Sequence, residues 1–249
     1  MRRPNNMRAW GSNPMSAESH ADFAARRARF RQQYPDDAAI TAYLQRLETN
    51  WPERVTLIQH ITDTVAGLGQ TQPQTQPQTQ PHVLELCCGP GRLATTLLST
   101  VPNLHYTAID LSPPFLDFAR QRLADYAKRV TLIEADLSEE SWPTLVSAQG
   151  KGGRFHAIVS LQSLHDVGDQ TAISRVYGLA KQLLLPGGCL LNADLIVDAG
   201  AELSDNPGRL PIAQHLDLLQ DQGYANVACT LAVGGFGCVI GWQVEHGLA

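Results

Sequence analysis

Apolar, strand-like runs alternate with helix-like runs through the C-terminal part of the chain, and this alternation restricts the fold more than any other feature. The strand-like runs span residues 82–87, 104–110, 130–136, 155–161 and 189–197. The helix-like runs span residues 91–100, 114–128, 169–184 and 211–222. Strands that alternate with helices of this length predict a parallel sheet with crossover helices on its faces. We therefore expect an α/β fold.

The C-terminal end departs from this alternation. Two strand-like runs, residues 226–233 and 238–244, are separated only by Gly-Gly-Phe-Gly, which leaves no room for a helix. Two successive strands joined by a short turn predict a hairpin, which adds antiparallel pairing to an otherwise parallel sheet. The expected sheet is doubly wound, mostly parallel and Rossmann-like, with this hairpin at its end.

The chain ahead of the sheet divides into three segments. Residues 1–15 are expected to be a disordered tail, and residues 16–70 are expected to form helices. Two apolar helical stripes support the second expectation, and they comprise Ile40, Tyr43, Leu44 and Leu47, then Val55, Ile58, Ile61 and Val65. Residues 71–81, a Thr-Gln-Pro repeat without apolar side chains, predict an extended linker before a domain over residues 82–249.

Charge and cysteine content argue against several classes of protein. Residues 1–31 carry seven arginines and two acids, a sum of +5, so the remainder sums to −10 within the total of −5. An acidic body matches a nucleic-acid backbone poorly, which argues against a nucleic-acid partner. The apolar runs fall short of the roughly 20 residues of a membrane helix, so no membrane partner is expected. Five cysteines without paired spacing, and no apolar signal segment, favour the cytoplasm.

The stretch HVLELCCGPGRLATTLL, residues 82–98, joins a strand-like run to a helix-like run through a glycine-containing turn. It does not suit a phosphate-binding P-loop, which needs a lysine and a hydroxyl where this chain has Arg-Leu-Ala after Gly91. A metal site is also disfavoured, because Cys87 and Cys88 are adjacent and would point to opposite faces of a strand. Small buried apolar side chains are the simpler role for both cysteines, and no metal is expected.

The same stretch matches a pattern typical of adenosine-containing cofactors. Gly89, Gly91 and Ala94 satisfy G-x-G-x-x-A, and Asp110 ends the next strand-like run. Glycines let the backbone approach the ligand, and a carboxylate at that place accepts from ribose hydroxyls. Glu85 lies inside the first strand, where a carboxyl group is costly unless it is hydrogen-bonded. Dinucleotide-binding strands are normally apolar up to the first glycine, so Glu85 favours another adenosine cofactor.

As an ordered set, these residues and the segments after them resemble class I S-adenosylmethionine-dependent methyltransferases of the small-molecule type. The matching segments are VLELCCGPGR, AIDLSPPFLDFA, EADL and LLLPGGCLL. The resemblance covers roughly residues 82–249 and is specific as a set, although each segment alone is weak. It implies a seven-stranded sheet with helices on both faces, an antiparallel last strand, and S-adenosyl-L-methionine over the carboxyl ends of the strands.

The resemblance implies nine cofactor-binding residues. They are Glu85, Cys87, Gly89, Gly91, Asp110, Leu111, Asp136, Leu137 and Leu161. Glu85 and the two glycines would shape the pocket for the methionine end, and Leu161 would lie beside it. Asp110 would accept from the ribose hydroxyls, and Asp136 with the backbone of Leu137 would hold the adenine. From the residues alone, Asp110 could instead cap a helix, and Asp136 could be a turn residue.

Cys87 departs from the family pattern, which commonly has glycine at this place. Cysteine does not adopt a positive φ without strain. The loop is therefore expected to avoid a positive φ at Cys87, or to bind the cofactor less tightly.

The segment Ser112-Pro113-Pro114-Phe115 resembles a motif by which amino-methyltransferases hold a nitrogen atom. In those enzymes the motif follows the fourth strand, whereas here it follows the second. After the second strand it more simply starts a helix, with Ser112 as the N-cap and proline in the first turn.

The loop after the fourth strand-like run, SLQSLHDV, lies at the edge of the sheet where ligands bind. Gln162 is a candidate acceptor contact, and His165 is a candidate general base because imidazole titrates near neutral pH. Capping of the next helix by His165 or Asp166 is the alternative. The helices before the linker are expected to fold back as a lid. Its candidate acceptor-binding aromatics are Tyr34, Tyr43 and Trp51.

Together these features predict an enzyme that moves a methyl group from S-adenosylmethionine to an oxygen, nitrogen or carbon of a small-molecule acceptor. The transfer would be an in-line displacement in which positioning carries most of the catalysis. Two alternatives stay open. A nicotinamide-dependent oxidoreductase would use the Gly89-x-Gly91-x-x-Ala94 loop, and a non-catalytic module would bind the cofactor without turnover.

Overall fold

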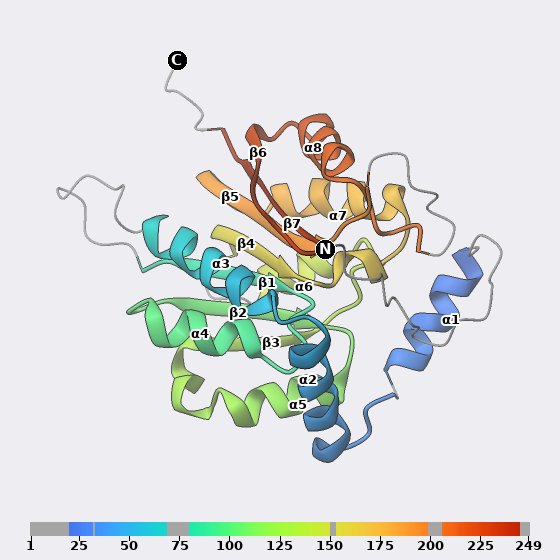
Figure 1. Cartoon of the computed structure of the whole chain (residues 1–249). Helices are drawn as coiled ribbons and strands as arrows, with labels where there is room; N and C mark the ends of the chain where they lie inside the picture. The colour runs from blue at the N-terminus through green and yellow to red at the C-terminus, as the bar shows by residue number, and fades with distance from the viewer. Residues whose placement is uncertain (1–19, 32, 69–79, 150–152, 199–205, 245–249) are drawn as a thin grey trace, which may run out of the picture.

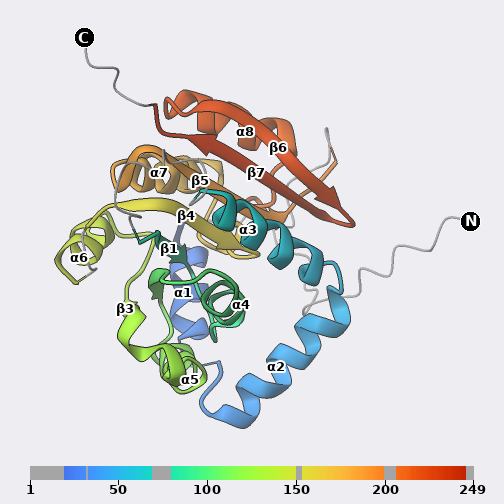
Figure 2. The ribbon, with the colours of Figure 1, turned by 90° about the vertical axis from the view of Figure 1, so that its left-hand side faces the viewer.

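The computed structural model describes residues 20–31, 33–68, 80–149, 153–198 and 206–244. The predicted tail over residues 1–15 and all but the end of the predicted linker over residues 71–81 lie outside these residues. In the described part, a central sheet lies between two layers of helices (Figures 1 and 2). No helix in this part is long and apolar enough to cross a membrane.

Seven strands form one sheet in the order β3-β2-β1-β4-β5-β7-β6. Their bounds are β1 His82–Leu86, β2 His105–Asp110, β3 Val130–Glu134, β4 Phe155–Leu161, β5 Leu184–Leu195, β6 Ala225–Val233 and β7 Phe236–Trp242. Neighbours among β1 to β5 pair in parallel, and β7 pairs antiparallel with both β5 and β6. The predicted mostly parallel seven-stranded sheet with a C-terminal hairpin is thereby confirmed.

Helices cover both faces of the sheet. Their bounds are α1 His20–Phe30, α2 Asp37–Asn50, α3 Arg54–Leu68, α4 Arg92–Thr100, α5 Pro113–Arg122, α6 Trp142–Gln149, α7 Gln170–Lys181 and α8 Ile212–Asp221, with short 3₁₀ helices η1 Ala124–Arg129 and η2 Leu164–Asp166. Helices α3, α4 and α5 contribute buried side chains to the core on one face. Helices α6, α7 and α8 contribute to the core on the other face.

Side-chain alternation in the strands separates these two cores. In β1, Val83 belongs to one core, whereas Leu84 and Leu86 belong to the other. A strand that is buried on both faces needs a near-continuous apolar run, which is the pattern of the parallel strands here. The division of the chain into a helical extension, a linker and a sheet domain stays a prediction, although α3 packs into the same core as α4.

The apolar stripe predicted for the segment before the linker is largely correct. Ile58, Ile61 and Val65 are buried as part of α3. Val55 is the exception, because it is 64% exposed. It lies beside a cavity at the first turn of the helix, so nothing covers it there.

Three other features of the secondary structure differ from the sequence prediction. The sequence pattern missed α6, whose eight residues are too few to show a helical period. The predicted helix over residues 114–128 divides into α5 and η1. Strand β5 begins at Leu184 rather than Cys189, because its Pro-Gly-Gly segment continues the strand through a shift in register against β4.

Replacing Gly91 by alanine tests how the turn after β1 is built. Gly91 has φ +77, and an added Cβ would lie 3.3 Å from the Cβ of Ala119 in α5. We expect Gly91→Ala to lower the free energy of unfolding by about 1–2 kcal/mol, because alanine resists a left-handed backbone. Urea denaturation measures the change. Gly235→Ala is the matched control, since nothing lies within 4 Å of its added Cβ. Equal effects of the two substitutions would contradict the account.

Candidate functional site

A cavity lies at the carboxyl ends of β1, β2, β3 and β4, and residues of α1 and α2 line its outer wall. It encloses about 1080 Å³, part of which is open to solvent. Eight of the nine predicted cofactor residues line it, namely Glu85, Cys87, Gly89, Asp110, Leu111, Asp136, Leu137 and Leu161. The structure therefore gathers residues from four strand ends into one site, and their role in binding stays a prediction.

The glycines of the loop after β1 have different functions. Gly89 lines the cavity and has φ +52, and its N–H donates to Asp110. Gly91 does not line the cavity. It starts α4 in the left-handed region, and its missing side chain lets α4 pack closely on α5. Gly91 thus affects the cavity indirectly, through the packing of α4 on α5.

Of the two alternatives expected for Cys87, a loop without a positive φ is wrong, and weaker cofactor binding stays a prediction. Cys87 has φ +55, a backbone that glycine adopts freely and cysteine adopts only with strain. The strained residue lies in the cavity wall beside the first glycine of the motif. The chain therefore adopts a left-handed turn at a position that carries a thiol instead of the hydrogen atom of glycine.

The two adjacent cysteines point to opposite sides of the sheet, as the sequence predicts. Cys87 packs against the core of α6 to α8, whereas Cys88 belongs to the core of α3 to α5. Burial raises the pKa of both thiols, so neither is a thiolate at neutral pH. Among the described residues, no group of three or more histidines, cysteines or acids could hold a metal ion.

Asp110 joins the loop after β1 to the start of α5. Its Oδ2 accepts the Gly89 N–H at 2.7 Å, and its Oδ1 accepts the Ser112 N–H at 2.9 Å. The carboxyl group is buried, which raises its pKa to about 6, and its backbone hydrogen bonds oppose that rise. Ser112, not Asp110, caps α5 by accepting from the Phe115 N–H, so the predicted helix start is confirmed.

Glu85 is a buried carboxyl group at the base of the cavity. Its side chain is 2% exposed and accepts a hydrogen bond from the hydroxyl of Tyr106 in β2. Burial raises the Glu85 pKa to about 8, although this hydrogen bond opposes the rise. Glu85 is therefore mostly protonated at neutral pH, and a cation placed beside it would favour its ionised form.

Arg54, in the first turn of α3, supplies a cation to the same end of the cavity. Its guanidinium donates to the side-chain carbonyl of Gln162, which follows β4 and has φ +54. Burial lowers the Arg54 pKa, and Tyr43 and Glu85 oppose that change. Arg54 is therefore a partly buried positive charge. Its neighbours here, Gln162 and protonated Glu85, are both neutral.

Asp136 is a turn residue that also lines the cavity, and its adenine-binding role stays a prediction. Its Oδ1 accepts the Ser138 N–H at 2.8 Å, which is a side-chain turn bond. Its Oδ2 lies 3.4 Å from the Nε of Arg27 in α1, and both residues line the cavity. Arg31 pairs with Glu134 nearby. Helix α1 is therefore attached to this end of the cavity by ion pairs.

Aromatic rings form the wall between α1, α2 and α5. Phe115 stacks on Tyr34 and Tyr43, with ring centroids 5.1 and 5.5 Å away, and Phe30 meets it edge-on at 5.5 Å. Tyr43 lines the cavity, so it stays a candidate acceptor contact. Tyr34 is 3% exposed and does not line the cavity, which makes it a packing residue of the wall.

Trp51, the third candidate aromatic, also lies outside this cavity. It meets Phe236 at the start of β7 edge-on, with ring centroids 5.4 Å apart. It lines a second cavity next to the first, together with residues of α2, α3 and α4. Its part in acceptor binding stays a prediction.

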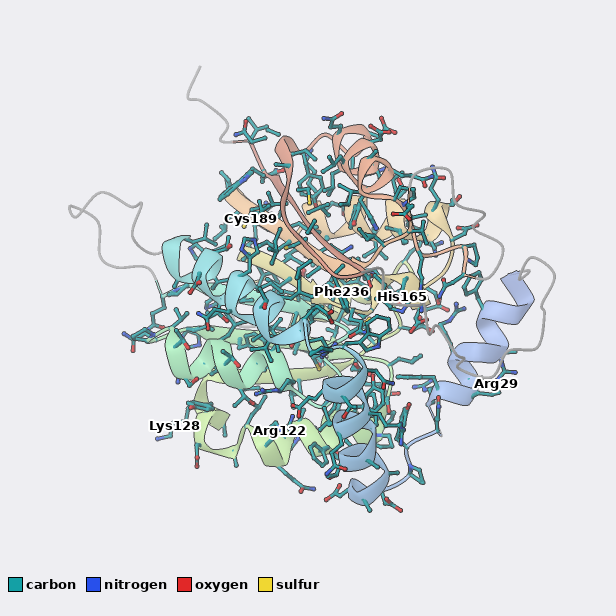
Figure 3. The ribbon with its side chains drawn as sticks, in the orientation of Figure 1. Arg29, Arg122, Lys128, His165, Cys189 and Phe236 are labelled. Atoms are coloured by element: carbon teal, nitrogen blue, oxygen red, sulfur yellow. The ribbon has the colours of Figure 1, made fainter. Side chains whose placement is uncertain are left out.

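His165 lies behind the cavity wall. It is inside the body of the protein, whereas Arg29 projects from α1 at the periphery (Figure 3). Its Nδ1 is 2.6 Å from Oδ1 of Asp194 in β5, and its backbone N–H donates to the other oxygen at 2.9 Å. Its Nε2 lies 3.5 Å from Asp166, which does line the cavity.

The ionisation of this buried pair follows from its charges. Burial lowers the His165 pKa, but Asp166 and Asp194 outweigh it, so the net change is a rise. Burial raises the Asp194 pKa, but His165 outweighs it, so the net change is a fall. The alternative that His165 or Asp166 caps the next helix is wrong, because Asp169 accepts from the Ala172 N–H and caps α7.

Several cavity residues escaped the sequence analysis. They are Arg27, Phe30, Leu44, Leu47, Arg54, Arg92, Phe115, Ser163, Asp166 and Val167. Leu44 and Leu47 lay on a stripe read as core, and Phe115 and Asp166 stood beside residues that were singled out. Arg54 had no local signal, because only the packing of α3 on the sheet brings it to Glu85.

Comparison with known proteins identifies the kind of domain that contains this cavity. The family described as "Methyltransferase domain" matches residues 84–190, which include the glycine loop and the ends of β1 to β4. A demethylmenaquinone methyltransferase of Leptospira interrogans is 29% identical over 114 residues, which cover 46% of this chain and 43% of that protein. A reducing polyketide synthase of Preussia isomera is 30% identical over 115 residues, 46% of this chain and 5% of the synthase. The chain spans less than half the length of these curated relatives.

Solved structures share the fold. An O-methyltransferase family protein from Burkholderia thailandensis has a TM-score of 0.64 and 22% identity, and the match covers 88% of this chain and 64% of that one. An amino pentose methyltransferase from Micromonospora echinaspora, solved with S-adenosylmethionine bound, has a TM-score of 0.60 and 14% identity. That match covers 82% of this chain and 97% of the other. At these identities the likeness shows the fold alone.

Strain at Cys87 predicts that glycine and alanine substitutions rank differently in stability at Cys87 and at Cys88. Cys87→Gly and Cys87→Ala both remove the thiol, but only glycine relieves the left-handed backbone. We expect the glycine variant to be more stable than the alanine variant by about 1 kcal/mol. Cys88 has no positive φ, so glycine relieves no strain there and only increases the conformational entropy of the unfolded chain. At this position the alanine variant should therefore be the more stable one. Chemical denaturation of the four variants measures both differences. The same order at both positions would refute strain at Cys87.

Proposed function

We propose that this chain, which carries a class I S-adenosylmethionine-dependent methyltransferase domain, transfers the donor's methyl group to an oxygen, nitrogen or carbon of a small-molecule acceptor. The observation that carries the proposal is the convergence of Glu85, Asp110 and Asp136, from the ends of three adjacent strands, on one cavity. This order of acids matches the order of the methionine, ribose and adenine portions of the donor.

The residues at the base of the cavity fit the amino-acid end of the donor. That end carries an ammonium and a carboxylate group. Glu85 can accept from the ammonium, and Arg54 offers a guanidinium to the carboxylate. Both groups line the same cavity, and each keeps hydrogen-bonding capacity beyond its partner within the protein, Tyr106 for Glu85 and Gln162 for Arg54.

The other end of the cavity fits an adenosine. Asp110 already accepts two backbone N–H groups, and a carboxylate has room to accept from ribose hydroxyls as well. Leu111, Ala135, Leu137 and Val167 give an apolar lining for a flat base. Arg27 closes this end by pairing with Asp136.

The nicotinamide alternative fits less well. A dinucleotide-binding sheet has the order 3-2-1-4-5-6, whereas this sheet inserts an antiparallel β7 between β5 and β6. Glu85 also lies in the strand just before the glycine loop, at the place where a pyrophosphate would approach. A carboxyl group there can ionise to bind an ammonium, whereas its ionised form would repel a phosphate and its neutral form offers a phosphate no positive charge.

When bound, the donor supplies a methyl group that is already activated by a positively charged sulfur. The chain has to align the acceptor with it and exclude water. Tyr43 on α2 and Gln162 after β4 both line the cavity and are the proposed acceptor contacts. Glu85 and Arg54 would hold the donor's amino-acid end, with Arg54 next to Gln162.

An acceptor that loses a proton needs a base. The Nδ1 of His165 is held by Asp194, which leaves Nε2 as the nitrogen that could take the proton. Asp166 lies between this Nε2 and the cavity, so a proton would pass through the Asp166 carboxylate or follow its displacement. We propose His165 as the base in its neutral form, with Asp194 as its positioning residue; because the neighbouring acids raise the His165 pKa, this form requires a pH above that pKa.

The proposed partner is a small molecule rather than nucleic acid, since the chain outside its first 31 residues sums to a net charge of −10. We also propose a cytoplasmic location. All five cysteines are free, and three of them are buried, which suits a reducing compartment.

Isothermal titration calorimetry tests the donor. We expect S-adenosylhomocysteine to bind with a micromolar Kd, and Asp110→Ala to weaken it about tenfold or more, because charged hydrogen bonds to the ribose are lost. Asp117→Ala is the matched control, since this acid is exposed on the surface of α5 and, within the described residues, pairs with Arg120. Binding of a nicotinamide dinucleotide with no binding of S-adenosylhomocysteine would overturn the proposal. Turnover to S-adenosylhomocysteine with a candidate acceptor would exclude the non-catalytic alternative.

Proton release on binding tests the role of Glu85. Its pKa of about 8 means that the free protein mostly carries the proton at pH 7. An ammonium beside Glu85 favours the ionised form, so binding should release protons at pH 7, and affinity should rise as the pH increases toward 8. Calorimetry in phosphate and Tris, which differ in ionisation enthalpy, measures the release. Glu85→Gln should abolish it. Equal binding enthalpies of the unaltered protein in both buffers would contradict this role.

A further inference from the structure

A second cavity opens beside the donor pocket, where α2 ends and α3 and α4 begin. It encloses about 560 Å³, part of which is open to solvent. Its lining residues are Leu44, Leu47, Glu48, Trp51, Pro52, Arg54, Val55, Ile58 and Arg92. We refer to this cavity as the side groove. None of the residues placed at the ribose or adenine end belongs to it.

The side groove and the donor pocket share one wall. Leu44 and Leu47 on α2, together with Arg54 and Arg92, line both cavities. The inner face of α2 therefore runs without interruption from the aromatic wall of the pocket to the groove. A molecule that lies along this face can occupy both spaces at once.

The far part of the groove is apolar and open. Trp51, Pro52 and Ile58 line it with Val55. Val55 is 64% exposed, and the other exposed large apolar side chains in the described residues are Val244 at 52% and Leu145 at 37%. Of those three, only Val55 lines either cavity. Apolar surface gathered at the mouth of a functional pocket is typical of a ligand-binding groove.

At the junction between the two cavities, Arg92 carries a positive charge that is available to bind an anionic ligand. Arg92 Nε lies 3.5 Å from Glu48 Oε1, and the two side chains are 41% and 60% exposed. An ion pair this exposed contributes little, so another anion can replace Glu48 at low cost. Arg54 stands at the same junction and is proposed to face the donor's carboxylate. Two guanidinium groups thus face one acid there.

We propose that the side groove binds the apolar body of the methyl acceptor and that Arg92 binds an acidic group on it. This inference rests on the proposed function, because it assigns the acceptor of the same site. The occupant is an elongated, mainly apolar organic acid. Its body lies along Leu47, Trp51 and Val55, its acidic group pairs with Arg92, and its reacting end reaches the donor pocket beside Gln162.

A fluorescent apolar anion, 1-anilinonaphthalene-8-sulfonate, is the probe. It is titrated into the full chain saturated with S-adenosylhomocysteine and then displaced by decanoate, decan-1-ol or decylammonium. These competitors share a ten-carbon body and differ only in head-group charge. We expect decanoate to displace the probe at a concentration about tenfold lower than decan-1-ol, and decylammonium to be the weakest.

Three substitutions locate the binding. Val55→Glu should weaken both probe and decanoate about tenfold, because it places a carboxylate in the groove. Val244→Glu makes the same change at a side chain that is 52% exposed and lines neither cavity, and it should change nothing. Arg92→Gln should make decanoate and decan-1-ol equally effective. S-adenosylhomocysteine affinity, measured by calorimetry, should be the same in the unaltered, Val55→Glu and Val244→Glu proteins.

The outcomes separate the two proposals. If Val55→Glu binds probe as well as Val244→Glu does, the groove is not the site. If decan-1-ol equals decanoate in the unaltered protein, the acidic group is wrong. If the unaltered protein binds no S-adenosylhomocysteine, the proposed function fails, and the acceptor role fails with it.

Discussion

The carboxylate of Asp110 is the contact on which the functional end of this molecule depends. It accepts one N–H from the glycine loop after β1 and another from the start of α5, at 2.7 and 2.9 Å. These bonds join two loops that leave neighbouring parallel strands, and they fix the left-handed turn that starts α4. The carboxylate that holds these loops through backbone hydrogen bonds is also the group proposed to accept hydrogen bonds from the ribose. Structure and binding therefore use the same group.

Around that carboxylate, the chain places polar groups where the sheet is otherwise apolar. Glu85 is buried near the end of β1, Asp194 is buried near the end of β5, and Arg54 is partly buried at the start of α3. Each has a partner, since Tyr106 donates to Glu85, His165 pairs with Asp194, and Arg54 donates to Gln162. Buried groups of this kind are costly to leave without a partner. The arrangement is preorganised for a ligand that carries both charges.

Much of the fold could be predicted because its signals are local. Parallel strands buried on both faces read as apolar runs, and the hairpin followed from two runs with no room between them. Asp110, Asp136 and the glycine loop were found because each ends a strand, and strand ends of a parallel sheet meet at one edge. Helix α6 was missed because eight residues show too little periodicity.

The remainder depends on tertiary packing. Nothing near Arg54 in the sequence indicates that α3 carries it to Glu85, and nothing near His165 indicates that Asp194, from another strand, binds it. The φ of +55 at Cys87 went against the residue's own preference, because the turn before α4 is set by the hydrogen bonds of Asp110 and by close packing at Gly91. Sequence patterns report preferences, and functional sites are where packing overrides them.

The measurement that tests the account most directly is a crystal structure of the chain with S-adenosylhomocysteine. The account predicts ribose hydroxyls on Asp110, the ammonium beside Glu85, the carboxylate on Arg54, and the sulfur directed toward Gln162. A ligand bound outside this cavity, or one whose ribose lies away from Asp110, would contradict it.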